Sequence, residues 1–381
     1  MIPSQRHLFD LPDDVAYLNC AYMSPLMTDV AEAVAAGARR KSRPWEIAPA
    51  DFFSDVEHAR GLFARLIGAT ADDVAVVPAA SYGIAVAARN LPLEAGQRIL
   101  VLEEQFPSNV YGWRELAKAR GAEVVTLSRG QDGDWTRVIL DAIDERTGIA
   151  ALANNHWADG SLIDLERVGA KLRDVGAALV LDLTQSLGAM PFSVPAVKPD
   201  FMVAACYKWM MGPYTIGFLY ADPKWHDGAP IEQSWMTRSN AEDFAGLVKY
   251  VDGFRPGARR YDMGEFANFA LMPGAVAAME KLLEWTPDAI AETLGQRTAE
   301  IAGKAARLGL QAPPDGARAP HFLGLRFPGA PPENLVGRLA ERNVFVSQRG
   351  SSMRVTPHLY NTDDDVGRLM DALGDILKGG D

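Results

Sequence analysis

The sequence predicts an α/β protein with a large domain, built on a mainly parallel, doubly wound sheet, and a smaller C-terminal α+β domain. Short apolar runs alternate with helical patterns up to about Tyr220, as in sheets whose strands are joined by crossover helices. From about Met272 this alternation gives way to two long helices followed by short strands. The 381 residues are 48% hydrophobic and 23% charged, which is typical of a globular chain with two or three domains.

The apolar runs of the first part are predicted to be buried parallel strands, because they are short, fully apolar and rich in β-branched residues. Helical patterns lie between several of them, including Asn109–Arg120 and Leu165–Val175. Asp164 is the expected N-cap of the second helix, and Gly176 marks its end. The predicted strands are Val74–Val77, Ile99–Leu102, Val124–Leu127, Ala150–Ala153, Ala178–Leu181, Met202–Ala205 and Ile216–Leu219.

The last third of the chain predicts a separate small α+β domain. We expect a large domain over residues 18–255 and a small domain over residues 256–381. Residues 1–17 are expected to form part of the small domain. The small domain is predicted to contain helices Pro273–Glu284, Pro287–Leu308, Glu333–Glu341 and Asp363–Leu377, and strands Leu323–Phe327, Val344–Ser347 and Arg354–Thr356.

Charge and cysteine content exclude several classes of protein. The 38 basic and 49 acidic residues give a net charge of −11, so we expect no nucleic-acid partner. No apolar run approaches the roughly 18 residues that span a bilayer, and the N-terminus is too polar for a signal peptide. We therefore expect no membrane partner and a cytoplasmic location. Cys20 and Cys206 are the only cysteines, which argues against a disulfide scaffold, and no metal site is predicted.

Polar residues follow several of the predicted strands, at the edge of the sheet where ligands bind in open α/β folds. Strand Val74–Val77 runs into small residues and a serine that open a helix, where free N–H groups would hold a phosphate. The other polar residues are Asp182 and Gln185 after one strand, Tyr207 and Lys208 after the next, and the run Asn154–Trp157 after a third.

A lysine, a carboxylate and a phosphate cradle at one edge of a sheet are what pyridoxal phosphate requires. The aldehyde of this cofactor needs an amine, and its pyridine nitrogen needs a carboxylate to stay protonated. Lys208 and Asp182 fit these roles. Each residue by itself has an ordinary structural explanation, since lysines are usually solvated and aspartates often end strands. The prediction of a pyridoxal-phosphate site therefore depends on finding Lys208, Asp182 and the phosphate cradle together.

The sequence also resembles the class V aminotransferases, the fold-type-I group of pyridoxal-phosphate enzymes that includes cysteine desulfurases, kynureninase and isopenicillin N epimerase-like proteins. The resemblance is carried by ALVLDLTQSLGAMPFSVPAVKPDFMVAACYKWMMGPYTIGFLY, NNHWADGSLIDL, EQFPSNVYGWREL and SSMRVTPHLYNTDDD, and so spans nearly the whole chain. A D-x-x-Q motif followed 26 residues later by a lysine (208 − 182 = 26) is its most specific part.

The resemblance implies roles for individual residues. Lys208 would form the internal aldimine, Asp182 would pair with the pyridine nitrogen and Gln185 would bind the ring hydroxyl. Arg354, whose planar fork suits a carboxylate, would bind that group of an amino-acid substrate. The remaining predicted cofactor contacts are Ala80, Ser81 and Tyr207 at the phosphate, Phe106 stacked on the ring and Trp157 in the pocket wall. His156 could act as an acid or base in the site, but a local hydrogen bond explains it better.

The branch of the family stays open between aminotransferase, lyase and epimerase. Cysteine desulfurases carry a nucleophilic cysteine ahead of the carboxylate-binding arginine, whereas this stretch reads NVFVSQRGSSMR. Cys20 and Cys206 are therefore predicted to be inert packing residues. A kynureninase-like hydrolase and a cysteine or cystine lyase are alternatives, although kynureninases typically have histidine where this chain has Gln185. A non-catalytic protein that binds pyridoxal phosphate is the alternative of another class.

The resemblance also implies a homodimer. Segment 253–269 is rich in glycine, arginine and aromatic residues. It matches the stretch that reaches the phosphate of a neighbouring subunit in the relatives.

Overall fold

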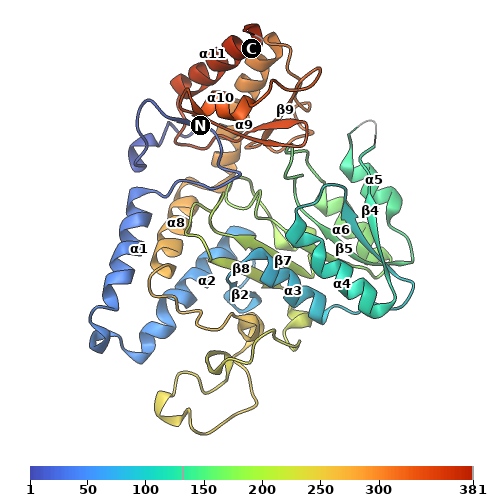
Figure 1. The fold of residues 1–381 in the computed structure, drawn as a ribbon. Helices are drawn as coiled ribbons and strands as arrows, with labels where there is room; N and C mark the ends of the chain where they lie inside the picture. The colour runs from blue at the N-terminus through green and yellow to red at the C-terminus, as the bar shows by residue number, and fades with distance from the viewer. Residues whose placement is uncertain (131–132, 380–381) are drawn as a thin grey trace.

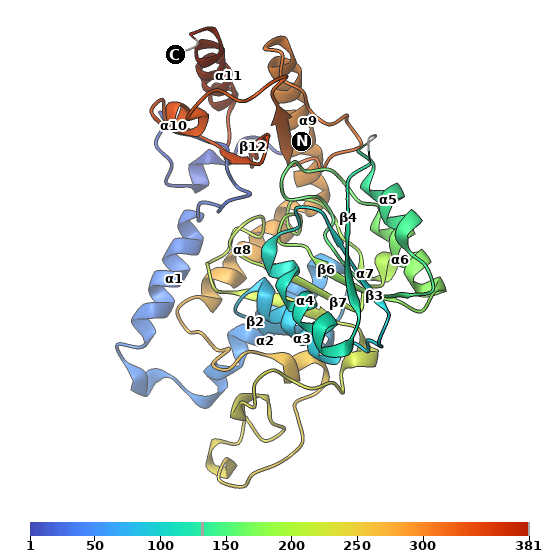
Figure 2. The same ribbon diagram turned by 45° about the vertical axis from the view of Figure 1, so that its right-hand side comes forward.

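The structure is a computed structural model that describes residues 1–130 and 133–379. Its centre is a seven-stranded sheet in the order β2-β8-β7-β6-β5-β3-β4 (Figures 1 and 2). The seven strands fall on the seven predicted apolar runs. Their bounds are β2 Val74–Val77, β3 Arg98–Leu102, β4 Glu123–Leu127, β5 Thr147–Leu152, β6 Ala178–Asp182, β7 Phe201–Ala205 and β8 Gly217–Ala221.

Two features of the predicted strands are corrected. Strand β8 was expected to be parallel, but it is antiparallel to both β2 and β7. The 11 residues between β7 and β8 (206–216) contain no crossover helix, and a parallel connection needs one. Strand β4 was expected to be buried, but Glu123 and Thr126 of this edge strand are exposed. The other edge strand, β2, is buried because the segment Gly257–Tyr261 packs beside it.

Helices cover both faces of this sheet. On one face α3 (Ala80–Asn90) and α4 (Tyr111–Arg120) pack against a core that includes Ala75 and Val77 of β2. The other face, which presents Val74 and Val76, packs against a second core with residues of the helices named at the end of this paragraph. Burial on both faces explains why the strands are apolar throughout. These helices are α2 Ser54–Ile67, α5 Trp135–Ala142, α6 Leu165–Asp174, α7 Val194–Val197 and α8 Met272–Trp285.

The predicted boundaries of α6 are confirmed. Asp164 is its N-cap, and its side chain accepts a hydrogen bond from the backbone N–H of Arg167 at 3.1 Å. Gly176 follows the helix with a φ of +74°, the left-handed conformation that glycine adopts without steric cost.

The C-terminal part has its own core. Strands β11 (Ser347–Arg349), β12 (Ser352–Val355) and β9 (Leu323–Arg326) form an antiparallel sheet in that order. Helices α9 (Pro287–Arg307) and α11 (Asp363–Lys378) contribute to this core together with the short α10 (Leu335–Ala340).

The two ends of the chain meet in this part of the molecule. Strand β1 (Ala16–Tyr17) pairs in parallel with β10 (Val344–Phe345). Helix α8 was predicted as part of the small domain. It packs against α1 (Thr28–Arg40) and α2, below the C-terminal sheet (Figure 1). The domain boundary at residue 255 stays a prediction. No helix within the described residues is long and apolar enough to cross a membrane.

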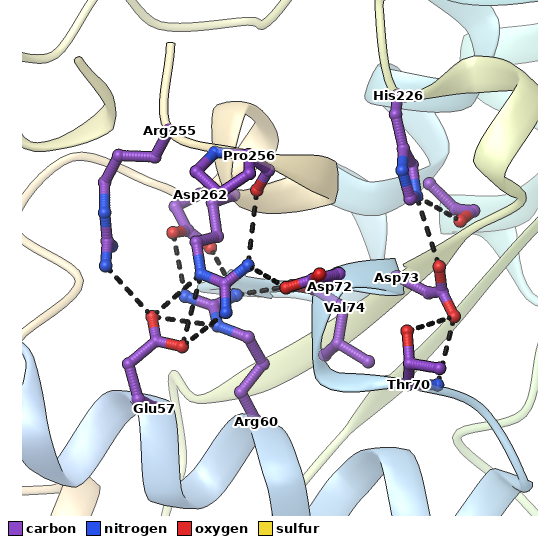
Figure 3. A network of polar contacts seen from close by, with 12 residues as sticks. Glu57, Arg60, Thr70, Asp72, Asp73, Val74, His226, Arg255, Pro256 and Asp262 are labelled. Carbon is purple, nitrogen blue, oxygen red and sulfur yellow. Dashed lines mark hydrogen bonds and ion pairs between the residues drawn. The ribbon is translucent and has the colours of Figure 1, made fainter. Parts of the chain in front are cut away.

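A buried ion pair fixes the last part of the long connection between β8 and α8. Arg60 of α2 donates to both carboxylate oxygens of Asp262, at 3.0 and 2.9 Å (Figure 3). Asp262 also accepts the backbone N–H of Val76 at 2.7 Å. Because Val76 belongs to β2, this pair fixes the segment beside the strand that leads into α3.

Candidate active site

A cavity of about 290 Å³ lies at the carboxyl ends of β2, β5, β6 and β7. Eight of the nine predicted site residues line it, and only Arg354 does not. The cavity therefore brings together residues that are far apart in the sequence, as the topology of a doubly wound sheet requires. The eight are Ala80, Ser81, Phe106, Trp157, Asp182, Gln185, Tyr207 and Lys208.

Lys208 lies in the loop after β7 and is only 6% exposed. Its Nζ is 5.3 Å from the ring centroid of Phe106 and 5.4 Å from that of Tyr207. Burial lowers the pKa of Lys208 to about 8, although the charge of Asp182 opposes this shift. A substantial fraction of the amine is thus neutral near physiological pH, which a nucleophilic or basic lysine requires.

Asp182 is the last residue of β6 and is buried at the cavity wall. Its Oδ1 accepts the backbone N–H of Thr184 at 3.0 Å. Burial raises the pKa of Asp182, whereas the Thr184 hydrogen bonds and the charge of Lys208 lower it. A cationic partner inside the cavity would compensate for this loss of hydration.

Gln185 is held by neighbours on both sides of its amide. Its Oε1 accepts the indole N–H of Trp209 at 3.0 Å, and its Nε2 donates to the backbone carbonyl of Ala21 at 3.1 Å. One amide N–H remains for a ligand in the cavity, since a side-chain amide has two.

The start of α3 provides the predicted phosphate cradle. Helix α3 has 11 residues and no side-chain N-cap, so its first N–H groups at Ala80 and Ser81 are available to an anion in the cavity. Gly83 lets this helix lie close to the sheet, because a Cβ there would come within 2.7 Å of Val203.

The aromatic wall of the cavity is well defined. Phe106 and Trp157 meet edge to face, with ring centroids 5.4 Å apart. The indole N–H of Trp157 donates to the carbonyl of Glu104 at 2.5 Å, which fixes the ring. Tyr207 packs against Tyr214 at 4.5 Å, and burial raises the pKa of Tyr207 to about 12, so its hydroxyl stays a donor.

Arg354 of β12 lies behind Trp157 and is 1% exposed. Its Nε donates to Ser347 Oγ at 2.9 Å and its Nη1 to the carbonyl of Trp157 at 3.2 Å. Its Nη2 is buried and has no partner. Burial and the charge of Arg349 lower the pKa of Arg354 to about 9. An anion at Nη2 would stabilise this guanidinium.

His156 does not line the cavity. Its ring stacks on Trp135 at 5.3 Å, and its Nε2 lies 3.0 Å from the carbonyl oxygen of Glu103. Burial lowers its pKa, so the ring is neutral at physiological pH. The prediction of a local hydrogen bond describes this histidine correctly.

Several residues that line the cavity were given no predicted role. Asn155 is the clearest, because both polar atoms of its buried side chain have no partner. It lies between Asn154 and Trp157 in the run that follows β5, and strand alternation would have selected it as a residue on the cavity side. The other polar ones are Gln105, Ser108, Thr184, Tyr214 and Thr215.

Neither cysteine takes part in the site. Cys20 and Cys206 are buried free thiols, and neither lines the cavity. Burial raises the pKa of both thiols. Neither cysteine therefore provides a thiolate nucleophile, in agreement with the prediction that they are packing residues.

The cavity suits pyridoxal phosphate. A lysine with a lowered pKa, a carboxylate without a cationic hydrogen-bond partner and a helix N-terminus for the phosphate all meet there. Both polar atoms of the Asn155 amide and the Nε2 of Gln105 have no partner, and they offer further hydrogen bonds to a polar ring. Fold and site together define a fold-type-I pyridoxal-phosphate enzyme.

Comparison with known proteins gives the family. The model of the aminotransferase class-V family matches residues 42–369, so the chain belongs to this family, whose members use pyridoxal phosphate. The uncharacterized aminotransferase YcbU of Bacillus subtilis is 27% identical over 83% of this chain and 82% of its own. Isopenicillin N epimerase of Streptomyces clavuligerus is 23% identical over 84% of both chains.

A solved structure shares the fold. A mutant of C-DES with glycine covalently linked to the pyridoxal-phosphate cofactor superposes with a TM-score of 0.86 at 18% identity, over 97% of this chain and 99% of that one.

Proposed function

We propose that this enzyme acts on an α-amino acid or a related amine, with pyridoxal phosphate bound through Lys208. The observation that carries the proposal is that Lys208 and Asp182 line one cavity and that Lys208 has a pKa of about 8. Pyridoxal phosphate, when bound, supplies an electron sink that stabilises negative charge at the α-carbon of the substrate. The protein supplies the groups that orient this chemistry and move its protons.

The lining residues divide the work of binding the cofactor. Asp182 would keep the ring nitrogen protonated by direct charge pairing, and the free N–H of Gln185 would bind the ring hydroxyl. Phe106 would stack on the ring, with Trp157 in the wall beside it. Ala80, Ser81 and Tyr207 would hold the phosphate, through N–H groups at the start of α3 and a phenol hydroxyl.

Lys208 then acts as the general base. Its Nζ would take the α-proton of the substrate, and the lowered pKa of Lys208 favours the neutral form that accepts a proton. Arg354 binds the α-carboxylate and so sets the orientation of the Cα–H bond. Transamination, elimination and epimerisation share these steps, and a cystine lyase or a kynureninase-like hydrolase would use them as well.

The test begins with the absorption spectrum of the purified protein. Bound cofactor gives a visible band, which Lys208→Ala should abolish together with turnover. Lys118→Ala, at an exposed position of α4, is the matched control and should keep both. A screen of amino acids for the pyridoxamine form, ammonia, pyruvate or sulfide then assigns the reaction. A Lys208→Ala variant with full activity would overturn the assignment.

We also propose a homodimer in the cytoplasm. The loop between β8 and α8 projects from the molecule at the bottom of Figure 1 and carries Val248 and Tyr250, which are 81% and 98% exposed. A second copy of the chain is the partner that fits this loop, since apolar side chains on a projecting loop favour a protein contact. The two free buried cysteines accord with a reducing compartment.

The arginines of segment 253–269 have partners in their own chain. Arg255 pairs with Glu57 (Figure 3). Arg259 also pairs with Glu57, and Arg260 pairs with Asp227. The contribution of this segment to a neighbouring phosphate stays a prediction, and it would require residues other than these paired arginines.

A further inference from the structure

We propose that the substrate is an amino acid whose side chain carries a second anionic group, and that Arg349 binds this group while Arg354 binds the α-carboxylate. The proposal rests on the proposed function, because it takes Arg354 as the anchor of the α-carboxylate. It goes further in assigning the chemical class of the substrate and a residue that selects it.

Arg349 and Arg354 lie on the same face of the hairpin formed by β11 and β12. In this antiparallel pair Ser347 lies opposite Arg354, and Arg349 lies opposite Ser352. Residues directly opposite each other share a face of a sheet, as do residues two positions apart on one strand. Both arginines therefore project from the hairpin in the same direction.

This shared face is directed at Trp157 in the cavity wall. The guanidinium carbon of Arg349 lies 5.6 Å from the centroid of the Trp157 ring, and that of Arg354 lies 5.7 Å from it. Both positive charges also act on Lys208, whose protonation they disfavour. The two arginines thus flank one side chain of the wall and contribute positive potential to the cavity.

Neither guanidinium forms an ion pair with a carboxylate of the described residues. Arg349 donates to the backbone carbonyl of Gln348 at 2.7 Å, and Arg354 leaves its buried Nη2 without a partner. Glu104 approaches the turn of the hairpin, since its Oε1 lies 3.8 Å from the position of a Cβ on Gly350, but it makes no ion pair with Arg349.

Two adjacent like charges, one of them fully buried, are unfavourable unless anions neutralise them. A single carboxylate fills the fork of one guanidinium. The cofactor phosphate belongs at the start of α3, so it does not account for the second cation. An amino acid with a side-chain carboxylate or sulfinate supplies both anions from one molecule.

The first experiment compares acidic amino acids with their neutral isosteres. Aspartate is paired with asparagine and glutamate with glutamine, and kcat/KM is measured for the enzyme loaded with its cofactor. We expect one acidic member to be preferred by on the order of 10- to 100-fold, the factor for a hydrogen bond to a charged group. Arg349→Gln should remove this preference, and Arg349→Lys should retain part of it.

The control is Arg342→Gln, because Arg342 is an exposed arginine of the same region whose Nη1 donates to the carbonyl of Arg338. This variant should keep the preference. Circular dichroism of the Arg349 variants checks that their fold is intact.

A binding measurement provides a readout that is independent of turnover. Succinate and glutarate are titrated into the same holoenzyme by calorimetry, with propionate and butyrate as monocarboxylate controls. The proposal is supported if a dicarboxylate binds the wild type more tightly than its monocarboxylate control does and if Arg349→Gln removes this difference. Equal affinities in the wild type, or an advantage that survives Arg349→Gln, overturn it.

These experiments distinguish a wrong substrate class from a wrong proposed function. If neutral amino acids react as well as acidic ones and Arg349→Gln changes neither, the substrate class is wrong while the proposed function stands. If the protein has no visible cofactor band and no amino acid reacts, the proposed function itself fails.

Discussion

At the scale of single residues, the site depends on two buried charges that lie in one cavity. Lys208 is shifted towards its neutral form by burial, and Asp182 is pushed towards its neutral form by the same cause. Each opposes the shift of the other through their mutual attraction. A cationic cofactor ring beside Asp182 would stabilise the charged carboxylate and so offset the cost of burying it.

The lowered pKa of Lys208 predicts a pH dependence of stability in the cofactor-free protein. Between pH 8 and 10.5 the unfolded lysine is protonated and the folded one is not, so stability rises with pH in this window. Below pH 8 both states are protonated and the penalty is complete. Relative to Lys208→Met, the wild type should gain roughly 1 kcal/mol per pH unit from pH 8 upwards, measured by urea unfolding. A difference that is constant with pH contradicts the shift.

Asp182→Asn should reduce catalysis more than cofactor affinity. The asparagine Oδ1 can still accept the N–H of Thr184, so the local fold is kept. It lacks the charge that keeps the ring nitrogen protonated, and this charge matters most in the transition state. We expect kcat to fall by on the order of 100-fold, the factor found when one preorganised electrostatic group is removed. An unchanged kcat would exclude Asp182 from the mechanism.

At the scale of elements, the loop after β5 connects the large sheet to the C-terminal part. Asp159 is buried and accepts from Arg129, from Ser161 and from Arg326 of β9 at 3.1 Å. The next residue, Gly160, has a φ of +81° and packs on Phe322. Because Trp157 lies in this loop, its position in the cavity depends on contacts between the two parts.

Gly160→Ala should destabilise the protein more than Gly176→Ala. Both glycines have a positive φ, but a Cβ at Gly160 would lie 2.7 Å from Phe322 O, whereas at Gly176 it would meet open space. We expect about 1 kcal/mol for Gly176→Ala from the backbone alone, and about 2–4 kcal/mol for Gly160→Ala because steric overlap is added. Urea unfolding measures the stability of both variants. Equal losses of stability would show that Phe322 can move away from the new Cβ at no cost.

At the scale of the whole molecule, the projecting loop and the C-terminal helices lie at opposite ends. The loop is at the bottom of Figure 1 and the C-terminal helices are at the top, with the sheet between them. A second copy that covers Val248 and Tyr250 would therefore leave α11 free. This separation provides a clean test of the proposed dimer.

Tyr250→Asp should weaken self-association by about tenfold or more, as expected for an aromatic side chain at the centre of an interface. Asp371→Lys on α11 also changes an exposed charge and should leave the association unchanged. Sedimentation velocity over a range of concentrations measures both variants. A wild-type protein that is active as a monomer contradicts the homodimer.

The sequence by itself determined the sheet and the residues gathered at its edge. Continuous apolar runs mark strands buried on both faces, and the carboxyl ends of the parallel strands meet at one edge, so Asp182 and Lys208 had to lie close together. The direction of β8, the position of His156 outside the cavity and the placement of Arg349 and Arg354 beside Trp157 were decided only by the tertiary structure. They depend on how loops return and how one hairpin packs on Trp157, and such contacts between distant segments leave no periodic pattern in a single sequence.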